Sequence, residues 1–277
     1  MTAPWCDNVR DMPTAAVNGT QVNYADSGGD GPALVLSHGY LMDASMFDAQ
    51  VAALAPDYRV ITWDQRGHGG TPAPGPFSYW DSASDVLALL GHLGIGEAVL
   101  GGMSQGGFVS LRAAILAPHV VRGLVLIDSQ AGTEADASRP GYEQMHQTWL
   151  DHGPGPVQEI VASIILGPGQ WDDWYAKWAA QYARLAPDNL SQLTWAFRCL
   201  MDRDDLTGRL GEVTAPALIV HGTEDAAIPL ASAEKMRDGL GGPTTFTPVA
   251  GGPHASNVTH ADAVNAAIAE FLPTLAG

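Results

Sequence analysis

The chain has 277 residues, of which 46% are hydrophobic, and its net charge is −17. A chain of this length can bury the core of one large domain. Its 13 lysines and arginines are outnumbered by 30 aspartates and glutamates, which would repel phosphate backbones and anionic lipid surfaces. The composition therefore excludes nucleic acid and membrane surfaces as expected partners and leaves a small molecule.

The start of the chain and its cysteines indicate where the protein works. The N-terminal residues lack a basic start followed by an apolar run, and no stretch approaches about 18 uninterrupted apolar residues. Cys6 and Cys199 lie far apart and in no metal-ligand or redox spacing. We expect ordinary thiols, no secretory signal, no membrane span and a cytoplasmic location.

Two short alternating runs in residues 14–28 are separated by Asn18-Gly19, which predicts a β-hairpin. Short apolar runs bounded by Gly, Pro or Asp then follow, and they predict strands that are buried on both faces. Amphipathic helical patterns alternate with these runs, which predicts a doubly wound α/β sheet. The strand-like runs are residues 33–38, 58–63, 97–102, 123–128 and 217–222, and the helical patterns are 45–55, 80–95, 106–117 and 259–272.

The alternation stops at residue 131 and resumes after residue 212, and the segment between is rich in Trp and Tyr. We expect a helical cap at 131–212 on a core domain made of residues 1–130 and 213–277. In the last helical pattern, Thr259 and Asp262 have capping-box spacing.

Gly102-Met103-Ser104-Gln105-Gly106 matches the pattern G-x-S-x-G. In that pattern a strand turns sharply into a helix and exposes the serine hydroxyl at the top of the sheet. The glycines are needed because the turn is strained and larger side chains would collide with neighbouring backbone. An apolar run precedes Ser104 and an amphipathic pattern follows it, so Ser104 is the candidate nucleophile.

A nucleophilic serine needs a histidine base that is oriented by a carboxylate. His254 lies in a Gly- and Pro-rich loop after a strand-like run, and we prefer it to His260 at the start of the final helix. Asp225 follows the run 217–222, and we prefer it to its neighbour Glu224 and to Asp128, which ends the run 123–128. Along the chain, Ser104, Asp225 and His254 occur in the order of nucleophile, acid and histidine that is expected for this α/β fold.

The oxyanion of an acyl-transfer reaction needs backbone N–H donors. Gln105, which follows the nucleophile, and Tyr40, in the loop after the run 33–38, are the expected donors. The remaining histidines are interpreted differently. His38, His68 and His221 precede glycines and are taken as loop residues, and the others, His146 among them, as surface or helix-end residues.

The segments LSHGY, WDQRGHG, GMSQGG, HGTED and GGPHASNVTHADAVN occur in the order found in the α/β-hydrolase superfamily, and the chain resembles it over almost its whole length. It is most similar to small serine esterases and lactonases, with some similarity to cofactor-free haloperoxidase and arylesterase relatives. The resemblance implies a mostly parallel eight-stranded sheet, a cap after the sixth strand, no metal or cofactor, and hydrolysis through an acyl-enzyme. Leu41 stands where the haloperoxidase-like members usually have proline, which argues against peracid chemistry.

We therefore predict a carboxylic ester hydrolase for a small or medium uncharged substrate, with Leu41, Trp174 and Trp178 as candidate substrate contacts. An alternative is hydrolysis of a carbon–carbon bond in an acid of the meta-cleavage type, which would need a cation near the serine. The third alternative is a ligand receptor on a hydrolase scaffold. The sequence is compatible with either a monomer or a homo-oligomer. The cap cations available for the second alternative are Arg139, Lys177, Arg184, Arg198 and Arg203.

Overall fold

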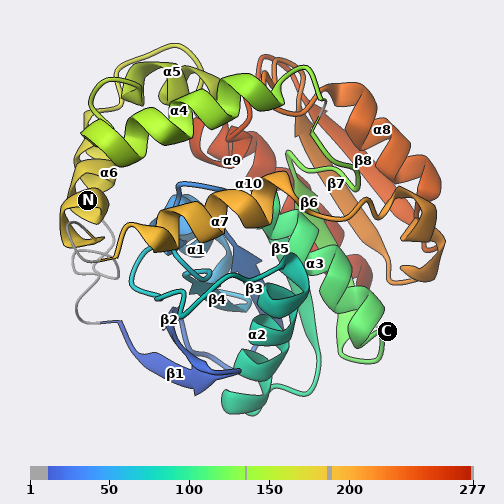
Figure 1. The fold of residues 1–277 in the computed structure, drawn as a ribbon. Coiled ribbons are helices and arrows are strands. Elements are labelled where there is room, and N and C mark those ends of the chain that lie inside the picture. Colours follow the sequence, from blue (N-terminus) through green and yellow to red (C-terminus); the bar gives the residue numbers. More distant parts are fainter. Residues whose placement is uncertain (1–11, 135, 186–188, 276–277) are drawn as a thin grey trace.

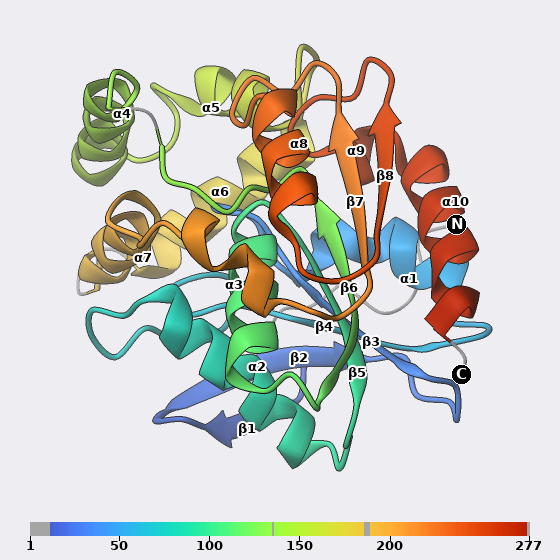
Figure 2. The same ribbon diagram turned by 90° about the vertical axis from the view of Figure 1, so that its right-hand side faces the viewer.

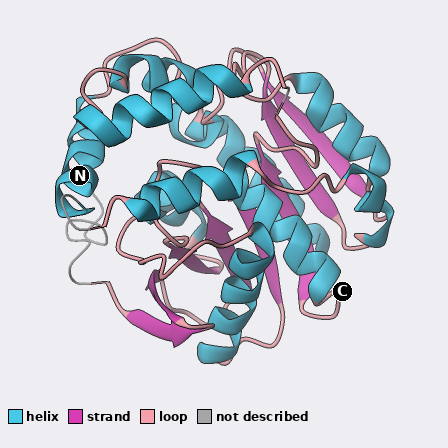
Figure 3. Ribbon diagram, viewed as in Figure 1, coloured by secondary structure: helices cyan, strands magenta, loops and turns pink. Residues whose placement is uncertain are grey.

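The computed structural model describes residues 12–134, 136–185 and 189–275, and in these residues the chain forms an eight-stranded sheet enclosed by helices (Figures 1 and 3). Six of the strands run parallel to one another, and an antiparallel hairpin extends one edge. The predicted α/β architecture is confirmed. The strands are β1 (Thr14–Val17), β2 (Thr20–Asp26), β3 (Ala33–Ser37), β4 (Arg59–Trp63), β5 (Ala98–Met103), β6 (Val121–Ile127), β7 (Ala217–Gly222) and β8 (Thr244–Val249).

The hairpin of β1 and β2 turns at Asn18-Gly19, as predicted. Both turn residues have positive φ, 46° for Asn18 and 77° for Gly19. Asn and Gly tolerate this conformation best, and its twist matches that of the flanking strands. β2 then pairs antiparallel with β4 and joins the hairpin to the parallel strands.

The strand order is β1-β2-β4-β3-β5-β6-β7-β8. Because β5, β6 and β7 are parallel neighbours, their carboxyl ends lie side by side at one edge of the sheet. The residues that follow these strands are Ser104, Asp128 and, after Gly222, the loop with Asp225. The topology therefore brings together three polar residues that are far apart in the sequence.

Helices cover both faces of the sheet. Figure 2 shows α1 and α10 on one side and α2, α3 and α8 on the other. The apolar stripe expected in residues 80–95 is the buried face of α2, which contains Val86, Leu89 and Leu90. The helices that flank the sheet are α1 (Asp48–Leu54), α2 (Tyr79–His92), α3 (Gln105–Leu116), α8 (Leu230–Gly239), α9 (Ser256–Thr259) and α10 (Ala261–Phe271). Short 3-10 turns accompany them at η1 (Ala44–Phe47), η2 (Thr207–Glu212) and η3 (Leu272–Leu275).

The capping box expected at Thr259 and Asp262 is wrong. Thr259 ends the short helix α9, and its hydroxyl bonds to the carbonyl of Ala255 and to the His260 ring. His260 is the N-cap of α10, and no side chain caps it. The chain is thus held as a separate turn before α10, so the helix begins two residues after Thr259.

A group of helices connects β6 to β7 and lies beyond the carboxyl ends of the strands (Figures 1 and 2). Their buried tryptophans, including Trp149 and Trp178, belong to the same apolar cluster as Phe47, Leu54 and Ile268 on one face of the sheet. This group is called the helical cover below; its delimitation as a cap domain of residues 131–212 stays a prediction. It consists of α4 (Arg139–His152), α5 (Gln158–Ile165), α6 (Asp172–Leu185) and α7 (Ser191–Met201).

Two further expectations concern the cysteines and the membrane. Cys199 is buried as a free thiol, and burial raises its pKa above the ordinary value, whereas Cys6 lies outside the described residues. No helix within the described ranges is both long enough and apolar enough to cross a lipid bilayer.

Candidate active site

Ser104 occupies the strained turn between β5 and α3. Its φ of 51° and ψ of −113° are unusual for a residue with a side chain. Two hydrogen bonds hold the backbone there: the Ser104 amide donates to the Ile127 carbonyl at 2.9 Å, and Ser129 Oγ donates to the Ser104 carbonyl at 2.8 Å. The next strand therefore stabilises the turn that presents the serine.

The glycines around Ser104 permit close approaches of the backbone. A Cβ on Gly102 would lie 2.3 Å from the carbonyl carbon of Gly106, and one on Gly106 would lie 1.8 Å from the Ser37 carbonyl oxygen. Side chains at these two positions would force α3 away from β5 and β3. The steric reason expected from the sequence is confirmed.

His254 and Asp225 are brought together from loops after β8 and β7. Nδ1 of His254 lies 2.8 Å from Oδ2 of Asp225, and the Asp225 side chain is fully buried. A carboxylate only accepts, so Nδ1 carries the proton and Nε2 is left with its lone pair. Oδ1 of Asp225 accepts from the amides of Ala227 and Ile228, both at 2.8 Å, which fixes the carboxylate.

The electrostatic surroundings of His254 favour its charged form. Burial lowers its pKa, but the charge and hydrogen bond of Asp225, with the charges of Asp128 and Glu134, raise the pKa above the ordinary 6.5 overall. An imidazolium formed at this position is therefore stabilised by the negative charges around it.

Asp128, the alternative acid, holds the backbone instead of His254. Its Oδ1 accepts from the Gly222 amide at 2.7 Å, and its Oδ2 accepts from the amide and hydroxyl of Ser256 at 2.9 and 2.6 Å. Burial, and next the charge of Asp225, raise the pKa of Asp128 to about 7. Asp128 therefore ties the end of β7 to the segment that follows His254.

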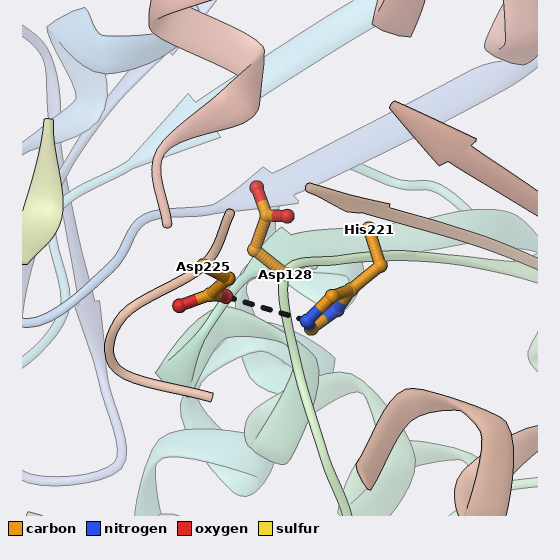
Figure 4. A group of neighbouring side chains, drawn as sticks. All are labelled: Asp128, His221 and Asp225. Atoms are coloured by element: carbon orange, nitrogen blue, oxygen red, sulfur yellow. Dashed lines mark ion pairs between the residues drawn. The ribbon is translucent and has the colours of Figure 1, made fainter. Parts of the chain in front are cut away.

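Asp128, His221 and Asp225 form the one cluster of potential metal ligands found within the described residues; each offers an atom within 4.8 Å of the others (Figure 4). His221 is a residue of strand β7 and not of a loop as expected, and its Nε2 lies 2.9 Å from the Ile228 carbonyl and 3.4 Å from Asp225 Oδ2. The carboxylate oxygens already accept several N–H and O–H donors, and one binds the His254 ring. The donor set fits a hydrogen-bond network better than a metal site.

Two backbone amides near Ser104 are available to a ligand. In the described part of the chain, the amides of Tyr40 and Gln105 donate no hydrogen bond. Gln105 is the first residue of α3, where the helix dipole also favours negative charge. The side chain of Gln105 is held away, since its Oε1 accepts from the Tyr79 hydroxyl at 3.0 Å. The two expected oxyanion donors thus lie in the loop after β3 and at the first residue of α3, which follows β5.

The loop after Tyr40 has a second strained residue. Leu41 has φ of 61°, and its carbonyl accepts a hydrogen bond of 2.7 Å from Nε1 of Trp178 on α6. On the other side of the loop, the Gly39 amide lies 3.3 Å from Sδ of Met46. The helical cover therefore helps to hold the backbone next to Tyr40.

A cavity lies between the sheet edge and the helical cover, and both Ser104 and His254 line it. The Ser104 hydroxyl and Nε2 of His254 have no hydrogen-bond partner among the described residues, and neither atom is sealed inside the protein. Most of its wall is apolar. The lining side chains from the helical cover are Tyr142, Met145, His146, Trp149, Val161, Ile164, Ile165, Leu193, Phe197, Leu200 and Met201, and the others are Tyr40, Leu41, Met103, Glu134, Ala227 and Ile228.

Of the three expected substrate contacts, the cavity includes Leu41 but not Trp174 or Trp178. Trp178 is only 1% exposed and packs edge-on against Trp149 with ring centroids 5.7 Å apart. Trp174 is 7% exposed. The expectation for the two tryptophans was wrong, because their shared helix face packs into the core of the cover.

Sequence reasoning missed His146 and Glu134 as cavity residues. His146 is not the surface residue that the sequence suggests: it stacks on Phe197 with ring centroids 4.1 Å apart, and burial lowers its pKa to about 4. Glu134 precedes α4 and is paired with buried Arg203 at 2.9 Å. Neither residue belongs to a motif, so no local sequence signal marked it.

None of the five cover cations named above lines the cavity. Arg139 and Arg198 bind Glu143, Lys177 bonds to Ser45, and Arg184 bonds to the Gly69 carbonyl. In the described chain, the cationic side required by the carbon–carbon alternative is therefore absent from this cavity.

An open, mostly parallel sheet that presents a serine on a strained turn, beside a histidine held by a carboxylate, defines the hydrolase class of α/β proteins. The family model for the alpha/beta hydrolase fold matches residues 32–261. The chain belongs to this family, and the resemblance seen in the sequence is confirmed.

Relatives cover nearly the whole chain. It is 32% identical to the "Putative carbamate hydrolase RutD" of Variovorax paradoxus, over 88% of this chain and 92% of the relative. It is 28% identical to 3-oxoadipate enol-lactonase 2 of Acinetobacter baylyi, over 92% and 94%. Among solved structures, the enol-lactonase from Burkholderia xenovorans superposes with a TM-score of 0.79 at 27% identity, over 94% of this chain and all of the other, 100%.

Proposed function

We propose that the chain is a carboxylic ester hydrolase, an esterase or lactonase, that works through an acyl-enzyme on a small-molecule substrate in the cytoplasm. The observation that carries the proposal is the open Ser104 hydroxyl on the same cavity wall as the open Nε2 of His254, whose Nδ1 is held by Asp225 at 2.8 Å. The named lactonase and carbamate hydrolase relatives support the same bond type, a carbonyl carbon joined to a heteroatom.

In the first half of the reaction, Ser104 Oγ attacks the carbonyl carbon while Nε2 of His254 takes the hydroxyl proton. The carbonyl oxygen becomes an oxyanion that accepts from the amides of Tyr40 and Gln105. When the bond to the leaving oxygen breaks, His254 gives it the proton and the acyl group remains on Ser104. Asp225 keeps the imidazole oriented and stabilises its charge.

In the second half, water attacks the acyl-enzyme and His254 takes its proton. Collapse of the oxyanion breaks the bond to Ser104 Oγ, which recovers its proton from His254, and the carboxylic acid leaves. A lactone follows the same steps, with the released hydroxyl still attached to the acyl part.

The test is proton release by the purified protein on a panel of simple esters, lactones and carbamates, beside Ser104→Ala. We expect turnover by the native protein and a loss of kcat of about 10⁴-fold or more in the variant. Turnover that survives Ser104→Ala, or a folded protein that is silent on the whole panel, would contradict the proposal.

A further inference from the structure

Glu134 is the acidic side chain of the cavity wall, in a wall that has no lysine or arginine among the described residues. His146 also lines the wall and is neutral near pH 7, because burial lowers its pKa to about 4. When His254 is neutral and able to act as the base, the charge that a bound molecule meets in this wall is therefore that of a carboxylate.

Among the described residues, one oxygen of Glu134 has a hydrogen-bond partner and the other has none. Oε1 accepts from Nη2 of Arg203 at 2.9 Å, and the Glu134 side chain is 15% exposed. No described residue donates to Oε2, and that oxygen is not sealed inside the protein. A carboxylate oxygen without a donor in a mostly apolar wall is a strong acceptor for an N–H or O–H group of a ligand.

Arg203 holds the Glu134 carboxylate in place from the side away from the cavity. Its guanidinium also donates to the carbonyls of Gly132 and Leu200 at 3.0 and 2.7 Å and lies 4.4 Å from the centre of the Phe108 ring. Its side chain is only 2% exposed and does not line the cavity. The guanidinium therefore compensates the charge of Glu134 without offering itself to the substrate.

The charge of Glu134 is felt at the neighbouring cavity groups. Burial, followed by the charges of Glu134 and Asp225, raises the pKa of Tyr142, which also lines the cavity. The charge of Glu134 contributes to the raised pKa of His254 as well. These effects agree with the cavity geometry, which places Glu134 in the same space as the reacting groups.

We propose that Glu134 is a specificity determinant: its free oxygen accepts a hydrogen bond from the substrate, so the cavity selects uncharged esters or lactones that carry a hydroxyl or amide N–H away from the reacting carbonyl. Substrates with a carboxylate there are rejected, because two negative charges would meet in an apolar space. This inference rests on the proposed function, and it names the substrate class of that site.

The experiment compares the phenyl esters of ω-hydroxy-, ω-methoxy- and ω-carboxyhexanoic acid. We expect kcat/KM for the hydroxy ester to exceed that of the methoxy ester by about tenfold and that of the carboxy ester by about a hundredfold. In Glu134→Gln the hydroxy-to-carboxy ratio falls at least tenfold, since the amide can donate to a carboxylate and Arg203 is no longer compensated.

Two further variants keep the result decisive. Glu143→Gln is the control: it removes one negative charge from α4, outside the cavity. We expect it to leave the kcat/KM ratios among the three esters unchanged. Glu134→Asp keeps a charged partner for Arg203 and serves if Glu134→Gln folds poorly. Its shorter side chain moves the carboxylate oxygen away from the ligand, so the preference for the hydroxy ester over the methoxy ester shrinks while the carboxy ester is still rejected. Equal ratios in the native protein and both Glu134 variants would overturn the inference.

Binding of the intact esters to Ser104→Ala, measured by calorimetry, separates the two proposals. If the native protein shows no Ser104-dependent turnover but Ser104→Ala binds the esters in the order hydroxy, methoxy, carboxy, the proposed function fails and the selectivity of Glu134 stands. If turnover depends on Ser104 but the binding order is flat, the function stands and the inference is wrong.

Discussion

The edge of the sheet and the helical cover contribute to the same cavity in different ways. At the sheet edge, Ser104, Asp128 and Asp225 follow neighbouring strands, and several backbone hydrogen bonds fix each of them. The cover supplies mostly apolar side chains, such as Met145 and Trp149, whose contacts are packing contacts. Under the proposed function, catalysis therefore depends on backbone geometry at the sheet edge, and substrate selection depends on the side-chain packing of the cover.

The two regions share an apolar cluster and several hydrogen bonds, and two of the features where they meet lie beside the cavity. Trp178 donates to the Leu41 carbonyl next to the Tyr40 amide, and Glu134 brings a charge into the wall before the cover begins. If the separation holds, changes at the sheet edge lower kcat for every substrate, changes in the cover alter the ranking of substrates, and changes at the contact points do some of each.

Asp225→Asn carries the largest effect that we expect after Ser104→Ala. The amide cannot provide the charge that stabilises the imidazolium, and it can hold the ring in the wrong tautomer. We expect kcat to fall by about 10³- to 10⁴-fold with little change in KM. Initial rates over the ester panel measure this, and a loss restricted to one substrate would contradict the expectation that the sheet edge affects kcat for every substrate.

The pH profile gives an independent readout of the same pair. His254 must be neutral to act as base, and its pKa is raised above 6.5, so activity falls as pH drops through a value above 6.5. Removing the charge of Asp225 lowers the pKa of His254, because that charge favours the protonated ring. The acid limb of the residual activity of Asp225→Asn should move to lower pH, and an unmoved limb would assign the base to another group.

Asp128→Asn tests whether the second carboxylate serves structure more than catalysis. Its oxygens face three donors, the Gly222 amide and the amide and hydroxyl of Ser256, so an amide group would set a donor against a donor. We expect the free energy of unfolding to fall by about 1–3 kcal/mol and kcat by about tenfold. Denaturant titrations check this beside Asp57→Asn, an exposed carboxylate whose change should be silent.

The sequence predicted the sheet edge well because its signals are local. The glycines at 102 and 106 have a steric reason that can be stated from the pattern alone, and β7 and β8 each precede the loop that carries Asp225 or His254. The hairpin at Asn18-Gly19 is likewise a property of two residues.

The cover could not be predicted in the same way. Spacing shows that Trp174 and Trp178 share a face of a helix, but not whether that face meets the cavity or the cover's own core. His146 reaches the cavity through the packing of helix α4, and Glu134 through its ion pair with Arg203. The separate turn of α9, tied by Ser256 to Asp128, replaces the capping box expected at Thr259. These features depend on contacts between residues far apart in sequence.

Trp178→Phe tests a contact point between the regions. The change removes the N–H that holds the Leu41 carbonyl at 2.7 Å, and the strained backbone of Leu41 then relaxes and displaces the Tyr40 amide. We expect kcat to fall by about tenfold and KM to stay nearly constant, because Trp178 does not line the cavity. Trp174→Phe, the same change on the same helix, should leave kcat near the native value. A loss expressed in KM alone would place Trp178 in substrate binding instead.

Met145→Ala has the smallest expected effect and tests the contribution of the helical cover alone. Met145 lines the cavity from α4 and is half-buried, so its truncation enlarges the apolar wall without touching the sheet edge. We expect kcat/KM to rise a few-fold for longer acyl chains and to fall a few-fold for short ones, since each methylene placed against or away from apolar surface is worth about 0.8 kcal/mol. The measurement is kcat/KM over a series of linear acyl esters, beside Gln144→Ala, an exposed neighbour on α4. A uniform drop for all chain lengths would mean that the cover also sets the geometry of the reacting groups, and the two regions would then act as one.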